Sequence, residues 1–310
     1  MDISFQKIKL EDKERISAYL EKKVYRSCDL VFPNIYLWSR KYPTKYAVVE
    51  DTLIFQGIAE NGAPSVTFPA GGQEQTRRAL QALRQWFRER QMGFRMHLVQ
   101  PKEFELLESW YPHTFQINYN RDIADYVYET EKLTSLAGKK LHGKRNHVNR
   151  FLENNPEWVY EPITPQNVEE CFQMALKWRE EMQCEIDVEK RDEMCVTLNA
   201  LRLMEELELK GGLLRIRPQG EVIAFTIGEP LDKDTFVVHI EKAFAQIQGA
   251  YPMINQQFVL HEAQSYKYVN REEDTGAEGL RKAKLSYRPA FLVEKGVVTP
   301  ASHSSMAELL

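Results

Sequence analysis

Polar side chains that could perform acid–base chemistry gather in one stretch of the second half of the chain. Residues 270–288 read NREEDTGAEGLRKAKLSYR. Glu272 and Asp274 are candidate general bases, whereas Arg281 and Lys284 could bind a phosphate or a carboxylate. The alternative is that the acids cap the following helix and balance Arg281. The density of polar residues between two apolar segments favours a functional role.

A second candidate lies at the end of the strand predicted over residues 235–240. Glu241 and Lys242 directly follow this strand. The turn around Gly249 follows, just before a helix predicted from about Pro252. A strand, a glycine turn and a helix N-terminus can expose free N–H groups to an anion. An ordinary strand–helix connection is the alternative.

The connector over residues 133–155 is basic. Five cations occur between residues 136 and 152 without one acid: Lys139, Lys140, Lys144, Arg145 and Arg150. In a helix Lys140, Lys144 and His147 share a face and could bind phosphates of a nucleic acid or a nucleotide cofactor. A solvated linker helix is the alternative.

Several other chemistries are not indicated. The sequence contains no serine hydrolase elbow, Walker loop or HExxH motif. Its four cysteines show no CxxC spacing, so we predict reduced thiols and no metal site.

Composition places these residues in an ordinary globular protein. The chain has 310 residues, 43% hydrophobic and 28% charged, which excludes collagen-like, coiled-coil and wholly disordered classes. This length suggests two domains. No apolar run approaches a membrane span and the N-terminus has no signal-peptide core, so we expect a cytoplasmic protein. Residues 1–155 carry 24 basic and 19 acidic groups, against 17 and 26 in residues 156–310. This asymmetry fits an anionic ligand near one side, or chance variation.

The predicted elements repeat. Each half gives strand, helix, three strands, helix, strand, helix and strand, with the last strand of the chain over residues 291–298. We therefore expect a mixed α/β fold with two copies of one unit. The expected bounds are 1–132 for the N-terminal domain, 133–155 for the basic linker helix, 156–298 for the C-terminal domain with the active cleft, and 299–310 for a flexible tail.

The doubled order resembles a tandem GNAT-fold acyltransferase. The segments 139–151, 241–243 and 270–289 further resemble soluble relatives of the phosphatidylglycerol lysyltransferase C-terminal domain, over about residues 1–298. This resemblance implies an acyl- or aminoacyltransferase that moves an activated group from aminoacyl-tRNA or acyl-CoA to an amine or hydroxyl. The turn from Gln246 to Tyr251 departs from the usual GNAT pyrophosphate motif at its last position, which weighs against ordinary CoA binding.

Under this interpretation the base is Glu241, followed by Glu272 and Asp274. The residues expected to bind donor or substrate are Lys140, Lys144, Arg145, Lys242, Gly249, Asn255, Asn270, Arg271, Arg281, Lys284 and Tyr287. Two other interpretations stay open, a non-catalytic GNAT-fold module that binds a phosphate-containing ligand and an RNA- or tRNA-binding regulator. The acceptor and the oligomeric state are not predicted.

Overall fold

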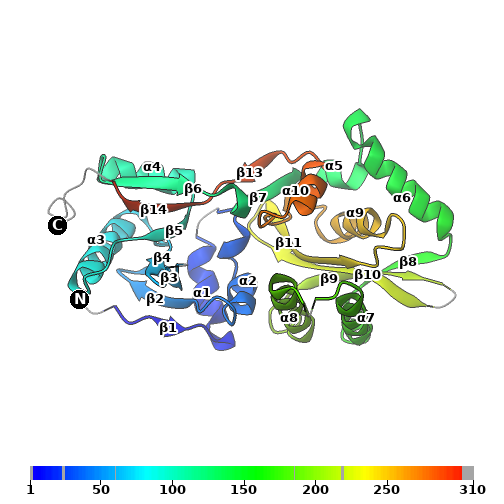
Figure 1. The fold of residues 1–310 in the computed structure, drawn as a ribbon, viewed down its shortest axis with the longest axis horizontal. Coiled ribbons are helices and arrows are strands. Elements are labelled where there is room, and N and C mark those ends of the chain that lie inside the picture. The colour runs from blue at the N-terminus through cyan, green and yellow to red at the C-terminus, as the bar shows by residue number, and fades with distance from the viewer. Residues whose placement is uncertain (1–2, 23–24, 60, 185, 218–219, 302–310) are drawn as a thin grey trace. The chain divides into compact units, whose positions relative to one another are not determined.

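The computed structural model describes residues 3–22, 25–59, 61–184, 186–217 and 220–301 (Figure 1). The chain forms two compact units. The first contains residues 1–25, 29–124 and 293–310, and the second contains residues 26–28 and 125–292. Most of the predicted tail, residues 302–310, lies outside the described residues.

The first unit is built on a seven-stranded mixed sheet in the order β1-β2-β3-β4-β5-β14-β6. Its strands are β1 (Gln6–Lys7), β2 (Lys45–Val49), β3 (Thr52–Ile58), β4 (Pro64–Val66), β5 (Met96–Val99), β6 (Phe115–Tyr119) and β14 (Gly296–Pro300). Its α-helices are α1 (Lys13–Leu20), α2 (Phe32–Trp38), α3 (Gln73–Glu89) and α4 (Pro101–Trp110). Ala79, Leu80 and Leu83 recur at helical spacing on α3 and are buried in the core of this unit.

The second unit has a seven-stranded mixed sheet in the order β13-β7-β12-β11-β10-β9-β8. Its strands are β7 (Asp125–Glu129), β8 (Trp158–Pro162), β9 (Lys210–Ile216), β10 (Glu221–Pro230), β11 (Thr235–Ala243), β12 (Tyr268–Asn270) and β13 (Phe291–Val293). Its α-helices are α5 (Thr130–Ser135), α6 (His142–Asn154), α7 (Val168–Glu181), α8 (Val188–Arg202), α9 (Ala250–Glu262) and α10 (Glu278–Leu285).

The same strand arrangement occurs in both sheets. In each, four successive antiparallel strands are followed by one parallel strand, β5 beside β4 and β12 beside β11. A parallel neighbour requires a crossover, which α3 provides in the first unit and α9 in the second. The predicted repeat and the mixed α/β class are confirmed.

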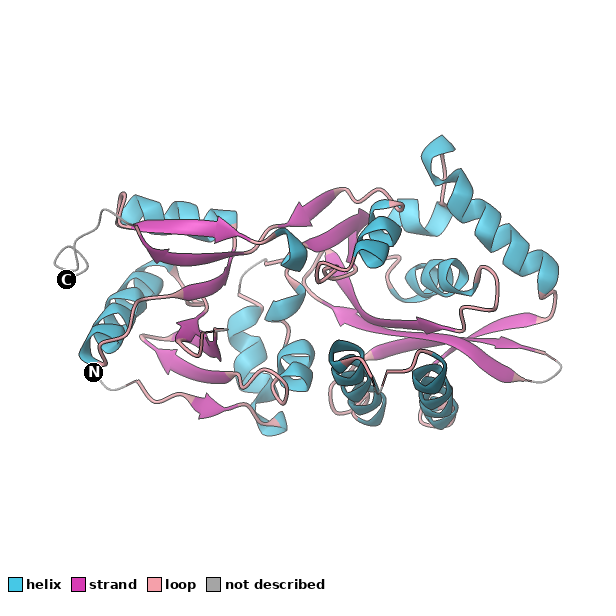
Figure 2. Cartoon of the chain, in the orientation of Figure 1, coloured by secondary structure: helices cyan, strands magenta, loops and turns pink. Residues whose placement is uncertain are grey.

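Helices cover both faces of the second sheet (Figure 2). Helix α9 packs on β9, β10 and β11 and is itself contacted by α5 and α6. Helix α7 packs on β10 and β11 beside α8. The predicted linker helix over residues 133–155 is instead α5, a 3-10 turn at Lys139–Leu141, and α6, all within the second unit.

The ends of the repeats differ from the expected bounds. Strand β7 begins the second sheet at residue 125, before the expected linker. The strand predicted over 291–298 is two strands, β13 in the second sheet and β14 in the first. Val298 of β14 is fully buried in the first unit's hydrophobic core, which explains why the chain returns there. None of the described helices is long and apolar enough to cross a membrane.

Candidate active site

The centre of the candidate site is the Glu241 carboxylate near the end of β11. One of its oxygens accepts a hydrogen bond from Asn255 Nδ2 of α9 at 3.0 Å. The other accepts from an Arg271 guanidinium nitrogen at 2.9 Å, from the loop that follows β12. The side chains of Glu241 and Arg271 are only 14% and 12% exposed, so this is a largely desolvated ion pair. Three predicted site residues from separate elements therefore meet at one carboxylate.

Aromatic and cationic side chains adjoin this ion pair. The Arg271 guanidinium lies 4.8 Å from the Tyr287 ring centroid, and the Lys144 ammonium of α6 lies 4.2 Å from the same centroid. Tyr128 of β7 packs edge-on against Tyr287. Burial raises the pKa of Tyr287 to about 12, although Arg271 opposes the shift. Burial lowers the pKa of Lys144, and Arg271 acts in the same direction.

Two buried polar atoms beside Glu241 have no hydrogen-bond partner among the described residues. They are Asn255 Oδ1, an acceptor, and Arg271 Nη1, a donor. The orientation of the Asn255 amide is set by its neighbour, because rotation by 180° would turn Oδ1 toward the carboxylate oxygen. Buried polar atoms normally have partners, so this pair has the character of a site that a ligand completes. We define Glu241, Asn255, Arg271, Tyr287 and Lys144 as the Glu241 cluster.

Glu272 does not join the Glu241 cluster. It accepts a hydrogen bond from His239 Nδ1 at 2.7 Å, and Glu229 of β10 accepts from the other ring nitrogen at 2.9 Å. Burial by itself would lower the pKa of His239, but the bonds to Glu229 and Glu272 outweigh it and raise the pKa to about 10. A carboxylate therefore faces each ring nitrogen, an environment that favours the charged form of the ring. The Glu272 carboxylate pairs with His239, whereas Asn255 and Arg271 both pair with Glu241, which disfavours the predicted role of Glu272 as the base.

The prediction that Asp274 is a base conflicts with its environment. Asp274 is fully buried and accepts hydrogen bonds from Arg281 at 2.7 and 2.9 Å, from Gly276 N at 2.9 Å and from the Tyr126 hydroxyl. Burial would raise the pKa of Asp274, yet these bonds outweigh it and hold the pKa well below its usual range. Asp274 and Arg281 therefore anchor the loop, which is the alternative that the sequence had left open.

Lys284 and Asn270 also anchor this loop. The Lys284 ammonium donates to the backbone carbonyls of Arg271 and Glu273, and burial lowers its pKa. Asn270 Nδ2 donates to Asp125 at 3.0 Å and to the Arg26 carbonyl at 2.7 Å, while its Oδ1 accepts from Glu272 N at 2.7 Å. With these bonds made, neither side chain is available to orient a substrate as predicted.

Lys242 lies on the other face of the sheet from Glu241. Its ammonium pairs with Glu193 of α8 and lies 4.1 Å from the ring centroid of Trp178 of α7. The side chain is only 4% exposed. Because α7 and α8 cover the face opposite to α9, Lys242 cannot share a ligand with the Glu241 cluster.

The residues predicted to bind phosphate lie in different environments. Gly249 precedes α9 with φ +83°, and a Cβ there would lie 2.2 Å from the His147 carbonyl of α6, so it provides a close helix contact rather than an open anion site. Arg145 donates to the carbonyls of Leu136 and Gly138 and closes the turn before α6. Lys140 is exposed. Of the basic connector, only Lys144 reaches the Glu241 cluster.

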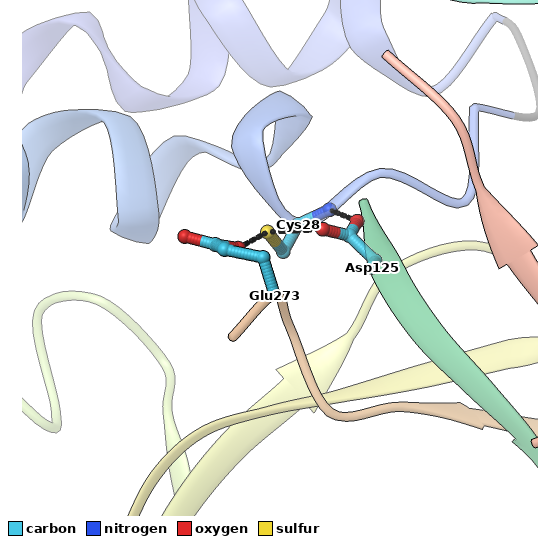
Figure 3. A group of neighbouring side chains, drawn as sticks. All are labelled: Cys28, Asp125 and Glu273. Carbon is cyan, nitrogen blue, oxygen red and sulfur yellow. Dashed lines mark hydrogen bonds between the residues drawn. The ribbon is translucent and has the colours of Figure 1, made fainter. Parts of the chain in front are cut away.

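Among the described residues, one group has donor types that could hold a metal ion. Cys28, Asp125 and Glu273 bring a thiol and two carboxylates within 4.8 Å of one another (Figure 3). Cys28 Sγ lies 3.3 Å from Asp125 Oδ1 and 3.4 Å from Glu273 Oε2, and the Cys28 backbone N–H donates to Asp125 Oδ2 at 2.9 Å. These hydrogen bonds already account for the group, since they tie residues 26–28 to β7.

Sequence reasoning did not select His239, Glu229 or Tyr128 as site residues, since a lone histidine on a strand is more often packed or surface-exposed than catalytic. His239 is an extra residue on β11, because Ile227 pairs with Ile240 and Gly228 pairs with Val238. Such a β-bulge re-aims a side chain and leaves no clear mark in a strand pattern. A separate cavity of about 210 Å³ is lined by α7 and β10 and contains none of the predicted site residues.

Comparisons with known proteins cover most of the chain. The sequence model of the family described as "Phosphatidylglycerol lysyltransferase, C-terminal" matches residues 23–297. An uncharacterised protein of Mycoplasmoides gallisepticum is 24% identical over 178 residues, which are 56% of this chain and 55% of that protein. The match therefore spans only about half the length of that curated relative.

Three solved structures have a similar fold. A conserved protein of unknown function from Bacteroides thetaiotaomicron is 37% identical, with a TM-score of 0.89 over 96% of this chain and 100% of that one. L-PGS from Bacillus licheniformis is 14% identical, with a TM-score of 0.63 over 96% and 95%. The C-terminal domain of a putative lysylphosphatidylglycerol synthetase from Agrobacterium fabrum is 12% identical, with a TM-score of 0.66 over 93% and 91%. These structures share the fold of this chain, in which two mixed sheets are each covered by helices, and the predicted mixed α/β class is confirmed.

Proposed function

Because the chain belongs to the phosphatidylglycerol lysyltransferase C-terminal family, we propose that it transfers an aminoacyl group from aminoacyl-tRNA to an amine or hydroxyl acceptor. The observation that carries the proposal is the unpartnered acceptor and donor beside Glu241, Asn255 Oδ1 and Arg271 Nη1. An α-aminoacyl ester offers the matching groups, an ammonium that donates and a carbonyl that accepts.

The same pair favours an aminoacyl donor over acetyl-CoA. An acetyl group has a carbonyl for Arg271 but no ammonium, so Asn255 Oδ1 would stay buried and unpaired. An unpaired buried polar atom costs about 1–3 kcal/mol. A site built in this way rejects the analogue that lacks the matching group.

Transfer requires a proton acceptor, stabilisation of the oxyanion and protonation of the leaving group, and the Glu241 cluster has side chains for these roles. The acceptor amine or hydroxyl attacks the ester carbonyl, and its proton passes to the Glu241 carboxylate. The charge that develops on the carbonyl oxygen is stabilised by Arg271 and by the Lys144 ammonium beyond the Tyr287 ring. A new C–N or C–O bond to the acceptor forms, the C–O bond of the ester breaks, and the ribose oxygen of the tRNA leaves as a hydroxyl with the proton that Glu241 accepted.

A ligand-stabilisation experiment tests this proposal. The full chain is unfolded in urea with aminoacyl-tRNA, the same tRNA uncharged, CoA or acetyl-CoA. A ligand at 100 times its Kd adds about 2.7 kcal/mol to the free energy of unfolding. We expect greater stabilisation by charged than by uncharged tRNA, and expect Asn255→Leu to abolish that difference. Equal stabilisation by both tRNAs would support an RNA-binding regulator instead, and stabilisation by CoA alone would support acyl-CoA binding.

A further inference from the structure

The loop that presents Arg271 is held in an unusual conformation. Glu272 has φ +58°, in the left-handed region that non-glycine residues rarely occupy. The backbone on either side is bound to β7, since Arg271 N donates to the Tyr126 carbonyl at 3.0 Å and Tyr126 N donates to the Glu272 carbonyl at 3.1 Å. Strain of this kind persists only where the surroundings enforce it.

The Glu272 side chain is hydrogen-bonded to His239, the bulge residue of β11. Its carboxylate meets Nδ1 at 2.7 Å, while Glu229 meets Nε2 at 2.9 Å. Two carboxylates can both accept only if both ring nitrogens carry protons. The ring's side chain is 6% exposed and those of Glu229 and Glu272 are 12% and 21%, so solvent screens this triad little.

We propose that His239 is a positioning residue: as an imidazolium shared by Glu229 and Glu272, it fixes Glu272 and thereby holds the adjacent Arg271 against Glu241. The bulge is what allows this, because it turns His239 toward the loop only two residues before Glu241 on the same strand. Strand β11 thus carries both Glu241, which pairs with Arg271, and His239, which pairs with Glu272, the residue next to Arg271. The inference rests on the proposed function only for its effect on catalysis.

The charge state of the ring can be measured without any substrate. Long-range ¹H–¹⁵N spectra of the uniformly labelled full chain at pH 7.5 report whether each ring nitrogen carries a proton, with His239 assigned by its loss in His239→Gln. His97 of the first unit is an internal reference, because burial lowers its pKa to about 4 and leaves it neutral. We expect two protonated nitrogens for His239 and one for His97. A neutral His239 ring would overturn the proposal.

The positioning role is measured at Arg271 itself. The Arg271 Nε–H signal is assigned by its loss in Arg271→Lys, and its solvent exchange is followed in His239→Leu. Arg215 is the matched control, because its side chain is also 12% exposed and ion-paired in the same unit, with Glu161 and Glu170. We expect exchange at Arg271 to rise at least tenfold while that at Arg215 changes less than twofold. An unchanged Arg271 in a folded variant, or an equal rise at both arginines, would contradict the role.

A second variant covers the case in which His239→Leu does not fold. Glu272→Gln keeps an oxygen for the Nδ1 proton but removes one negative charge from the triad. We expect Arg271 to stay protected and the ring to lose its second proton at a lower pH than in the wild type. Ring titration at an unchanged pH would show that Glu272 does not hold the imidazolium. Neither measurement requires transfer activity, so failure here is distinct from failure of the proposed function.

Discussion

Glu241 and Lys242 are neighbours in the chain, yet their side chains lie on opposite faces of the second sheet. Glu241 meets Asn255 of α9, whereas Lys242 meets Glu193 of α8 and the ring of Trp178 of α7. The alternation of a β-strand separates them, and the helix layers then enclose each in its own environment. One of the two can take part in chemistry with Arg271, and the other cannot.

Replacing Glu241 should abolish transfer. In Glu241→Gln the side chain keeps its shape but cannot accept a proton, and Arg271 loses its anionic partner. Loss of a general base lowers rates by about 10²–10⁴-fold. The rate of aminoacyl transfer from charged tRNA measures this. Glu153→Gln, at a glutamate of α6 that is 70% exposed, is the control and should retain the wild-type rate.

Replacing Lys242 should leave transfer unchanged. Lys242→Met keeps the apolar stem beside Trp178, and Glu193 is 46% exposed, so it can be solvated once its partner is gone. We expect a change of about 1 kcal/mol or less in the free energy of unfolding, comparable to a cation–π contact. Urea denaturation and the transfer rate are measured together. A loss of transfer with unchanged stability would assign Lys242 to the site after all.

These contrasts show how far sequence reasoning reaches. Glu241 is predicted at the end of a strand, Asn255 and Arg271 are named under the acyltransferase interpretation, and the fold brings the three together. The same residue types also predict Asp274, Arg281, Lys284 and Asn270 as site residues, but in the structure these four anchor the loop. Residue type alone does not distinguish the two uses, because both need charged groups at high density. The distinction depends on backbone conformation, above all the left-handed Glu272.

The order of elements is easier to predict than the ends of the repeats. The hydrophobic periodicity of α3 and the turn residues between strands are local signals, and they indicate the repeat. The place of β14 in the first sheet depends instead on contacts between residues far apart in sequence, Gly296 with Val99 and with Tyr119. The bulge at His239 is likewise a matter of register between two strands. Neither the place of β14 nor the bulge at His239 can be predicted from a local sequence pattern.

Gly249 should tolerate no side chain. In Gly249→Ala the residue must keep φ +83°, and the new Cβ would lie 2.2 Å from the His147 carbonyl and 2.9 Å from Phe151 Cβ. The left-handed conformation costs about 1–2 kcal/mol, and separation of α6 from α9 adds to this. We expect a loss of more than about 2 kcal/mol in the free energy of unfolding, measured in urea.

The control for Gly249 lies in the contacting helix. A Cβ added at Gly143 of α6 would meet nothing within 4 Å, and Gly143 has no left-handed φ. Gly143→Ala should therefore be neutral or should stabilise α6 by up to about 1 kcal/mol. Because Lys144 follows directly, this variant also tests whether α6 can be altered without loss of transfer. Equal destabilisation by both substitutions would mean that Gly249 makes no special contact.

The His239 triad predicts how stability depends on pH. The folded pKa of His239 is about 10, above the unfolded value of 6.5, so the folded state binds more protons between these values. The stabilisation is therefore fully present below pH 6.5 and is lost as pH rises toward 10, with a slope of up to about 1.4 kcal/mol per pH unit. Other groups also have shifted pKa values: the raised pKa of Cys184 acts in the same direction as that of His239, whereas the lowered pKa values of Lys144 and Lys284 act in the opposite direction. The difference between wild type and Glu272→Gln isolates the contribution of the triad.

In urea unfolding at about pH 6.5, 7.5 and 8.5 we expect the Glu272→Gln variant to lose less stability across the series than the wild type, because its His239 ring holds the second proton less tightly. Parallel curves for the two proteins would show that Glu272 contributes nothing to the protonation of His239.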